Sequence, residues 1–297
     1  MLQLQITMFL IMAVGFICAK LKMFAKNGRE ALTGLFINIM IPSSIISAFC
    51  QSLTPDTFIK GIWMVAAYTL SLIFCWAIGK VLYRRFSPDK QKILKYATIV
   101  SNAQFMGFPV IQAVVGNEGL VLASMAMIPV SAFTWTIALA QFTKIDGRKG
   151  LKNILTHPCF CAVIIGVCLA LLPIPLHPGI TDALEWVGNC VMPISMLIIG
   201  SILAESDIRS IFDWKLYYFS FIRLIAIPAI LYLFFTAVHL DPLVRNVTVI
   251  MTAMPAGTVT AMLAEKYGAD ARFASSAIFI STLLSIVSLP ILAAVLF

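Results

Sequence analysis

Residues 97–116, ATIVSNAQFMGFPVIQAVVG, and residues 247–268, VTVIMTAMPAGTVTAMLAEKYG, decide the fold of this chain. Identical residues recur between them at a shift of about 150 positions: Thr98 with Thr248, Ala103 with Ala253, and Gly107 with Gly257. Beyond the second stretch, Ala274-Ser275 matches Ala123-Ser124 at nearly the same shift. Each identity is common in membrane helices, but the constant shift predicts an internal duplication.

Composition places both stretches in a membrane protein. Apolar residues make up 61% and charged residues 11% of the 297 residues, and the mean hydropathy is +0.98, whereas soluble domains carry about 25% charged residues. A spanning helix needs about 20 mostly apolar residues. Ten runs meet this requirement: 3–21, 31–50, 61–82, 96–115, 119–142, 154–173, 183–204, 216–237, 247–264 and 274–296. We therefore predict an all-α membrane protein with ten transmembrane helices.

The duplication divides these helices into two halves, residues 1–153 and residues 154–297. The second helix reads Asn38-Ile-Met-Ile-Pro42 and the seventh reads Asn189-Cys-Val-Met-Pro193, so the pattern N-x-x-x-P also recurs. Five helices per half is an odd number, and the second half must therefore enter the membrane from the opposite face. This arrangement is the inverted repeat of many secondary transporters.

Positive charge alternates from gap to gap between the predicted helices. Of the 21 Lys and Arg residues, 18 lie in or beside five alternate gaps, whereas the opposite gaps hold only Lys60 and Arg245. Both termini are therefore predicted to lie outside the cell, in a plasma (bacterial inner) membrane. Cations in short gaps indicate topology, and no nucleic-acid partner is expected. Arg223, about two turns inside the eighth helix, is expected to snorkel to the cytoplasmic interface rather than to bind substrate.

Proline and glycine interrupt both quoted stretches, at Gly107-Phe108-Pro109 and at Pro255-Ala256-Gly257. Proline removes a backbone donor and clashes with the preceding turn, so it can break a helix and expose backbone groups. We predict two broken helices whose half-helix N-termini meet at the membrane midplane, where their partial positive charge suits a carboxylate. Pro42 and Pro193 are further predicted break positions. The alternative is that these prolines only kink packed helices.

Uncharged polar residues surround the predicted breaks and form the candidate substrate site. The candidates are Ser101, Asn102, Gln104, Thr258 and Thr260, together with Asn38 and Asn189 of the N-x-x-x-P pattern. Polar side chains in lipid need partners, so bonding between helices is the alternative role for each of them.

Several functions are disfavoured by what the predicted spans lack. No Asp, Glu, Lys or His lies in the central half of any span, which disfavours a proton pump with a buried carboxylate and an intramembrane hydrolase. We expect no enzyme activity and no cofactor. The seven cysteines are expected to be unpaired thiols. Cys159 and Cys161 have no histidine or second cysteine pair at metal spacing nearby, so no metal site is expected.

The fourth and ninth helices resemble those of the auxin efflux carrier family, which includes plant PIN carriers and short bacterial carriers associated with malate and malonate. The similar segments are Asn102-x4-Gly107-x-Pro109, residues 253–291, His157-Pro158 followed by Gly166, and residues 188–203. The resemblance covers essentially the whole chain. The sequence departs from plant carriers at Thr260, where they have a second proline, and it lacks the long cytoplasmic loop of many plant members.

The resemblance implies a scaffold domain of the first, second, sixth and seventh helices. The third to fifth and eighth to tenth helices would form a transport domain that moves as an elevator. It also implies that Asn102 contacts the substrate and that Pro109 and Pro255 mark the two breaks. A homodimer through the scaffold helices is a further implication.

Taken together, these features predict a secondary transporter of small organic anions, such as malate, malonate or auxin-like acids. Two alternatives remain open. A sodium-coupled carrier of bile-acid-like anions belongs to a superfamily that shares the ten-helix plan, and sodium could bind carbonyls and hydroxyls exposed at the breaks. A membrane-embedded metabolite sensor is the other alternative, although the short loops offer no appended signalling domain.

Overall fold

The structure is a computed structural model that describes residues 2–23, 28–143, 152–153, 155–171, 176–204 and 213–296. The chain divides into two compact units. Unit 1 comprises residues 1–63, 104–127 and 155–205, and unit 2 comprises residues 64–103, 128–154 and 206–297. Five cations of the predicted gaps lie outside the described residues: Lys26, Lys144, Arg148, Lys149 and Arg209.

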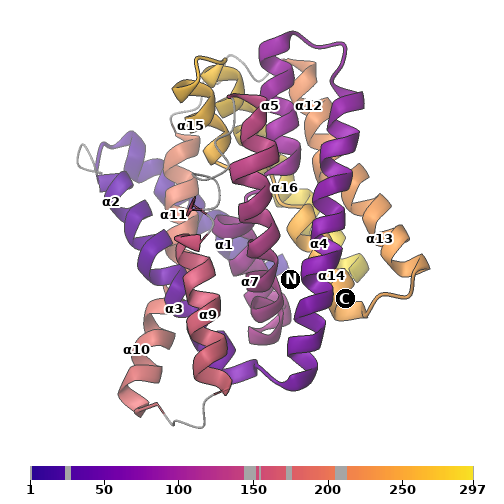
Figure 1. The fold of residues 1–297 in the computed structure, drawn as a ribbon. Coiled ribbons are helices and arrows are strands. Elements are labelled where there is room, and N and C mark those ends of the chain that lie inside the picture. Colours follow the sequence, from indigo (N-terminus) through magenta and orange to yellow (C-terminus); the bar gives the residue numbers. More distant parts are fainter. Residues whose placement is uncertain are drawn as a thin grey trace. The chain divides into compact units, whose positions relative to one another are not determined.

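Unit 1 contains the helices of the first, second, sixth and seventh predicted spans. They are α1 (Leu2–Lys20), α2 (Gly28–Leu35), η1 (Phe36–Met40), α3 (Ile41–Ser52), α9 (Pro158–Leu171), α10 (Pro178–Asn189) and α11 (Val191–Leu203). The unit also takes in the first turns of α4 (Pro55–Leu82), the helix α6 (Phe108–Val115) and the beginning of α7 (Asn117–Phe133). Within this unit α3 packs against both α9 and α10 (Figure 1).

Glycine allows two helices of unit 1 to pack with their backbones in contact. Gly15 of α1 lies against the backbone of Leu197 in α11, and Gly200 of α11 lies against the backbone of Met12 in α1. A methyl group on either glycine would overlap the facing backbone. Such close approach stabilises helix pairs in lipid, where hydrophobic burial between helices contributes little.

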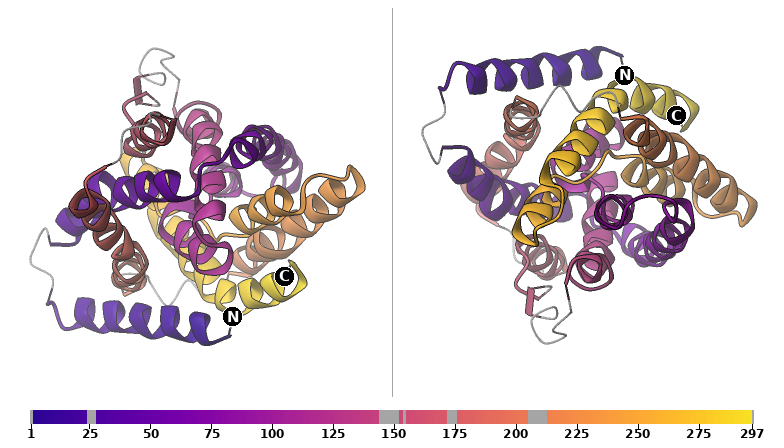
Figure 2. Two further views of the ribbon diagram at one scale, coloured as in Figure 1. Left: turned by 90° about the horizontal axis from the view of Figure 1, so that it is seen from below. Right: turned by 90° about the horizontal axis from the view of Figure 1, so that it is seen from above.

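Unit 2 contains most of α4 and the helices of the last three predicted spans. Its elements include α5 (Pro88–Ile99), η3 (Thr134–Ala138), η4 (Leu139–Gln141), α12 (Trp214–Phe221), η6 (Ile222–Ala226), α13 (Ile227–Ala237), α14 (Pro242–Thr252), α15 (Val259–Lys266) and α16 (Ala271–Leu296). The elements α12, η6 and α13 form one unbroken helix (Figures 1 and 2). The core of the unit joins residues of α5, α12 and α16, such as Leu94, Phe219 and Ala277.

Five helices within the described residues are long and apolar enough to cross a membrane. They are Gly28–Ser52, Pro55–Leu82, Pro178–Ala204, Trp214–Ala237 and Ala271–Leu296, and they coincide with the second, third, seventh, eighth and tenth predicted spans. Shorter apolar helices cover parts of the first, fourth, fifth and sixth spans: Ile6–Lys20, Ala103–Val115, Asn117–Phe133 and Pro158–Leu171. The predicted all-helical class is confirmed for the described residues, and the count of ten spans stays a prediction.

Two of the four prolines that were predicted to break helices, Pro42 and Pro109, lie inside continuous helices. Pro42 and Pro109 are each the second residue of an α-helix that continues a π turn, η1 and η2 (Ala103–Gly107) respectively, and the helix runs on through them. A π turn carries one extra residue, which relieves the clash of the proline ring and the loss of its N–H. Pro193 lies in the first turn of α11, which follows α10 after one turn residue, Cys190, with φ −71° and ψ −14°. The predicted breaks at Pro42 and Pro109 are therefore wrong, and the chain at Pro193 is only slightly irregular.

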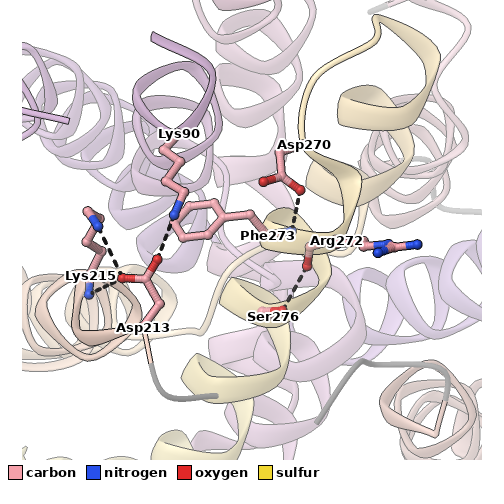
Figure 3. Close-up of polar contacts among 7 residues, drawn as sticks. All are labelled: Lys90, Asp213, Lys215, Asp270, Arg272, Phe273 and Ser276. Atoms are coloured by element: carbon pink, nitrogen blue, oxygen red, sulfur yellow. Dashed lines mark hydrogen bonds and ion pairs between the residues drawn. The ribbon is translucent and has the colours of Figure 1, made fainter. Parts of the chain in front are cut away.

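Charged residues join three helices at one end of unit 2 (Figure 3). Asp213 caps α12 by accepting a hydrogen bond from the N–H of Lys215 at 3.1 Å, and it accepts another from Lys90 Nζ of α5 at 2.7 Å. The Lys90 ammonium also lies 4.6 Å from the ring centroid of Phe273 in α16. Asp270 caps α16 by accepting from the N–H of Phe273 at 3.0 Å. These contacts fix the ends of α5, α12 and α16 relative to one another.

Candidate functional site

The fourth predicted helix is interrupted at residues 100–102. The helix α5 ends at Ile99, Val100 is extended with φ −97° and ψ 103°, and helical structure resumes at Ala103. Gly107 has helical angles, φ −66° and ψ −48°. The predicted break at Gly107 and Pro109 is therefore corrected to Val100–Asn102, where no proline or glycine marks it.

The ninth predicted helix is interrupted between Thr252, where α14 ends, and Val259, where α15 begins. This interruption contains Pro255 and Gly257, as predicted from the sequence. The two interruptions thus differ in origin, because only the second is built around proline and glycine.

The two interrupted segments lie side by side within unit 2. Ser101 and Ala256 form an antiparallel bridge. The N–H of Asn102 donates to the carbonyl oxygen of Pro255 at 2.9 Å, and the N–H of Gly257 donates to the carbonyl oxygen of Val100 at 3.1 Å. At each interruption, backbone N–H and C=O groups lose their hydrogen bonds within the helix. Backbone groups of the other interruption replace these bonds, because buried backbone groups need partners.

Gly257 is needed for this close approach. A Cβ atom at this position would lie 3.1 Å from the carbonyl oxygen of Val100 and 3.3 Å from that of Ser101. Both neighbours are backbone atoms held in the bridge, so they have little freedom to move aside.

Arg223 of η6 satisfies two more carbonyl groups at the interruptions. Its Nη1 donates to the carbonyl oxygen of Thr98 at 2.7 Å, and its Nε donates to that of Met254 at 3.1 Å. Nη1 also lies 3.9 Å from the Sγ atom of Cys75. The residue is 1% exposed. The prediction that Arg223 snorkels to the interface is therefore wrong, because acceptors inside unit 2 hold its guanidinium.

The position of Arg223 has a clear electrostatic reason. Thr98 lies in the last turn of α5, and Met254 follows the end of α14. The carbonyl end of a helix carries a partial negative charge and favours a cation. The sequence signal was present, because an arginine inside an apolar span marks a functional position by default.

Two predicted site residues bring unpartnered polar atoms to the buried region around the interruptions. Asn102 is 2% exposed and Thr260 is fully buried. Neither the Nδ2 atom of Asn102 nor the Oγ1 atom of Thr260 has a hydrogen-bond partner in the described part of the chain. Buried polar atoms are rarely left unpaired, so each is a candidate contact for a small polar ligand.

The other two candidates of unit 2 are less enclosed. Ser101 is half-buried, and its Oγ atom lies 3.5 Å from the hydroxyl oxygen of Tyr68. Thr258 is half-buried and precedes α15. Four of the seven predicted substrate residues thus lie at the paired interruptions of unit 2.

The remaining three candidates belong to unit 1. Gln104 donates from Nε2 to the Sγ atom of Cys159 at 3.1 Å, and exposed Asn38 donates to the carbonyl oxygen of Gly34 in its own helix at 2.9 Å. Asn189 lines a polar cavity of about 40 Å³. The other residues of this cavity are Ser44, Ser47, Gln51, Gln112, Asn117, Glu185 and Gly188.

The cysteine side chains of the described residues are not joined in disulfides. Seven cysteines are free thiols: Cys18, Cys50, Cys75, Cys159, Cys161, Cys168 and Cys190. No group of three His, Cys, Asp or Glu residues that could hold a metal ion occurs in the part of the chain that the structure describes.

Comparison with known proteins gives consistent matches over nearly the whole chain. The model of the membrane transport protein family matches residues 2–150 and 142–293. An "Uncharacterized transporter" of Methanothermobacter thermautotrophicus is 28% identical, with 98% of this chain and 97% of the relative covered. The "Uncharacterized transporter YfdV" of Escherichia coli K12 is 22% identical, with 95% and 93% covered. A "Putative malonate transporter" of Rhizobium meliloti is 24% identical, with 86% and 80% covered.

Proposed function

Because this chain belongs to the membrane transport protein family, an auxin efflux carrier-like family of integral membrane transporters, we propose that it is a secondary transporter of small organic anions. The substrates would be mono- or dicarboxylates. The observation that carries this proposal is the pairing of Ser101 with Ala256, which joins two interrupted helices beside buried, unpartnered polar atoms.

The chemistry of these atoms favours a carboxylate. The Nδ2 atom of Asn102 and the hydroxyl of Thr260 are hydrogen-bond donors. The helix α15 begins at Val259, directly after the second interruption, and the N-terminus of a helix offers free N–H groups and a partial positive charge to an anion. Uncharged donors and a helix dipole can hold a carboxylate without a buried ionic partner that touches it.

The substrate class is narrowed by one relative. The Rhizobium meliloti protein is named for malonate, a three-carbon dicarboxylate. We propose malonate and malate as the first substrates to test, with auxin-like monocarboxylates as a second group. Transport across a plasma (bacterial inner) membrane, with both termini outside, is part of the same proposal.

We propose an elevator mechanism for the movement. The division of the chain into compact units supports it in part, because unit 1 contains the first, second, sixth and seventh predicted helices, which were expected to form the scaffold. Unit 1 also contains residues 104–127, which were expected in the transport domain. A homodimer through the scaffold helices completes the proposal.

Two other functions remain candidates. A sodium-coupled carrier of bile-acid-like anions would bind sodium through carbonyl oxygens at the interruptions. The carbonyl oxygens of Thr98 and Met254 already accept hydrogen bonds from Arg223. A metabolite sensor would bind the same anions without moving them across the membrane.

Uptake by purified protein in sealed lipid vesicles tests the proposal. Vesicles loaded with unlabelled malonate should accumulate external labelled malonate or malate by exchange, with saturable kinetics and no added partner protein. Binding of the same anions without any exchange would favour the sensor. Exchange of bile acids but of no short carboxylate would favour the bile-acid-type carrier.

A further inference from the structure

Two helix ends direct carbonyl oxygens at one buried position in unit 2. The carbonyl oxygen of Thr98, at the end of α5, and that of Met254, after the end of α14, both lie within hydrogen-bond distance of one side chain. Carbonyl oxygens at helix C-termini carry partial negative charge. Oxygen ligands of this kind are also what hard metal cations such as Na⁺ and Ca²⁺ bind in proteins. The two carbonyl oxygens therefore favour a cation at this position.

The guanidinium of Arg223 occupies this position. Its guanidinium is 2.7 Å from one of the two carbonyl oxygens and 3.1 Å from the other, and the residue is 1% exposed. Guanidinium keeps its charge at any physiological pH and presents five donors in a rigid fork. A buried charge is tolerated only when it is hydrogen-bonded, and the carbonyl ends of two helices from distant parts of the chain provide these bonds.

We propose that Arg223 is a built-in cation that takes the place of a coupling metal ion between the two interruptions, so that anion transport by this protein does not require sodium. A coupling ion must bind and leave during each transport cycle, whereas a guanidinium attached to η6 cannot leave. The positive charge beside the interruptions therefore stays constant. This inference rests on the proposed anion transport, and Arg223 acts in it as a positioning residue that holds the interruptions without touching the substrate.

The test compares wild-type protein with Arg223→Met, Arg223→Lys and the control Arg84→Met in the vesicle exchange assay. Arg84 is an exposed arginine whose Nε donates to the carbonyl oxygen of Lys80 in its own helix. Labelled malonate exchange is measured with sodium and with sodium replaced by N-methylglucamine. Wild-type protein and Arg84→Met should exchange malonate equally in both media. Arg223→Met should lose at least about tenfold in exchange rate, because two charge-assisted hydrogen bonds are removed, and Arg223→Lys should be intermediate.

Added guanidinium ion separates a cation site from a merely structural arginine. Millimolar guanidinium should restore part of the exchange by Arg223→Met and raise its unfolding temperature, with no such effect on wild-type protein or Arg84→Met. Sodium-dependent exchange by wild-type protein, full exchange by Arg223→Met, or the absence of any guanidinium effect on Arg223→Met would each overturn the proposal. If Arg223→Met does not fold, Arg223→Lys replaces it in the exchange assay, where full exchange by Arg223→Lys or sodium-dependent exchange by the wild-type protein would overturn the proposal.

The unfolding measurement needs no substrate. If wild-type protein exchanged no carboxylate in either medium, the proposed function would fail, and the guanidinium effect on the unfolding temperature would still report on the cation site.

Discussion

The backbone N–H of Asn102 donates to the carbonyl oxygen of Pro255 at 2.9 Å. These residues come from helices that are more than a hundred positions apart in the chain, and each lies where its helix is interrupted. One interruption therefore stabilises the other, because an extended segment inside an apolar unit has no water to satisfy its backbone groups. A substitution in one interruption should consequently destabilise the other interruption as well.

Thr260→Val is expected to stabilise the protein while weakening substrate binding. The hydroxyl of Thr260 is buried without a partner, and replacing an unsatisfied polar group by an apolar group of similar shape is neutral or stabilising. If the hydroxyl donates to the bound carboxylate, its loss should weaken malonate binding by about 1 kcal/mol. The measurements are the unfolding temperature and the affinity for labelled malonate. Unchanged affinity in Thr260→Val would remove this residue from the site.

Gly257→Ala should destabilise the paired interruptions. The added methyl group would lie 3.1 Å from the carbonyl oxygen of Val100, and crowding in a packed region costs about 1–3 kcal/mol. Gly34→Ala in α2 is the matched control, because a Cβ atom there meets nothing within 4 Å and alanine favours a helix over glycine. Thermal unfolding should show a lower midpoint for Gly257→Ala only. An equal midpoint for both variants would mean that the interruptions are looser than the structure indicates.

Asp213→Asn should reduce stability at neutral pH but not in acid. Burial alone raises the pKa of the Asp213 carboxyl, but hydrogen bonds from Lys90 and Lys215 and the charges of both lysines hold this pKa below its ordinary value. The stabilisation is therefore complete above the unfolded pKa of about 3.9 and is lost as the pH falls through the lower folded pKa.

Asparagine keeps the cap of α12 but removes the charge, so Asp213→Asn should cost up to about 1 kcal/mol at pH 7. The difference from wild-type protein should shrink below about pH 4. Asp89→Asn is the control, because the Asp89 side chain is 62% exposed and lies 3.5 Å from Lys92. A difference between Asp213→Asn and wild-type protein that is the same at every pH would contradict this assignment.

Much of the architecture could be predicted from apolar runs, because a helix of about 20 apolar residues is a local property of the sequence. Pro255 and Gly257 also marked the second interruption correctly. The first interruption was misplaced because the repeat aligns Gly107 with Gly257, and sequence periodicity does not show that a π turn accommodates Pro109. The extended conformation at Val100–Asn102 depends on backbone partners from the other interruption, which no local pattern reveals.

The partners of the Arg223 side chain could not be predicted from local sequence patterns either. Its partners, Thr98 and Met254, are distant in the sequence and contribute backbone carbonyl oxygens. Every residue has such an oxygen, so the sequence does not show which ones bind the guanidinium. An arginine inside an apolar run is an unusual feature, but it was interpreted as a snorkelling side chain. The choice between snorkelling and an internal role depended on helix ends that only the three-dimensional structure brings within reach.

Equilibrium binding of labelled malonate to purified wild-type protein, Asn102→Ala and Asn153→Ala tests the central claim most directly. Asn153 is exposed and lies outside the predicted spans. Asn102→Ala removes the buried Nδ2 donor but keeps the backbone N–H that bonds to Pro255, so its unfolding temperature should stay within a few degrees of the wild-type value. We predict saturable binding by wild-type protein and Asn153→Ala, and a loss of about tenfold or more in affinity for Asn102→Ala. Equal malonate affinity in all three proteins would contradict a carboxylate site at the paired interruptions.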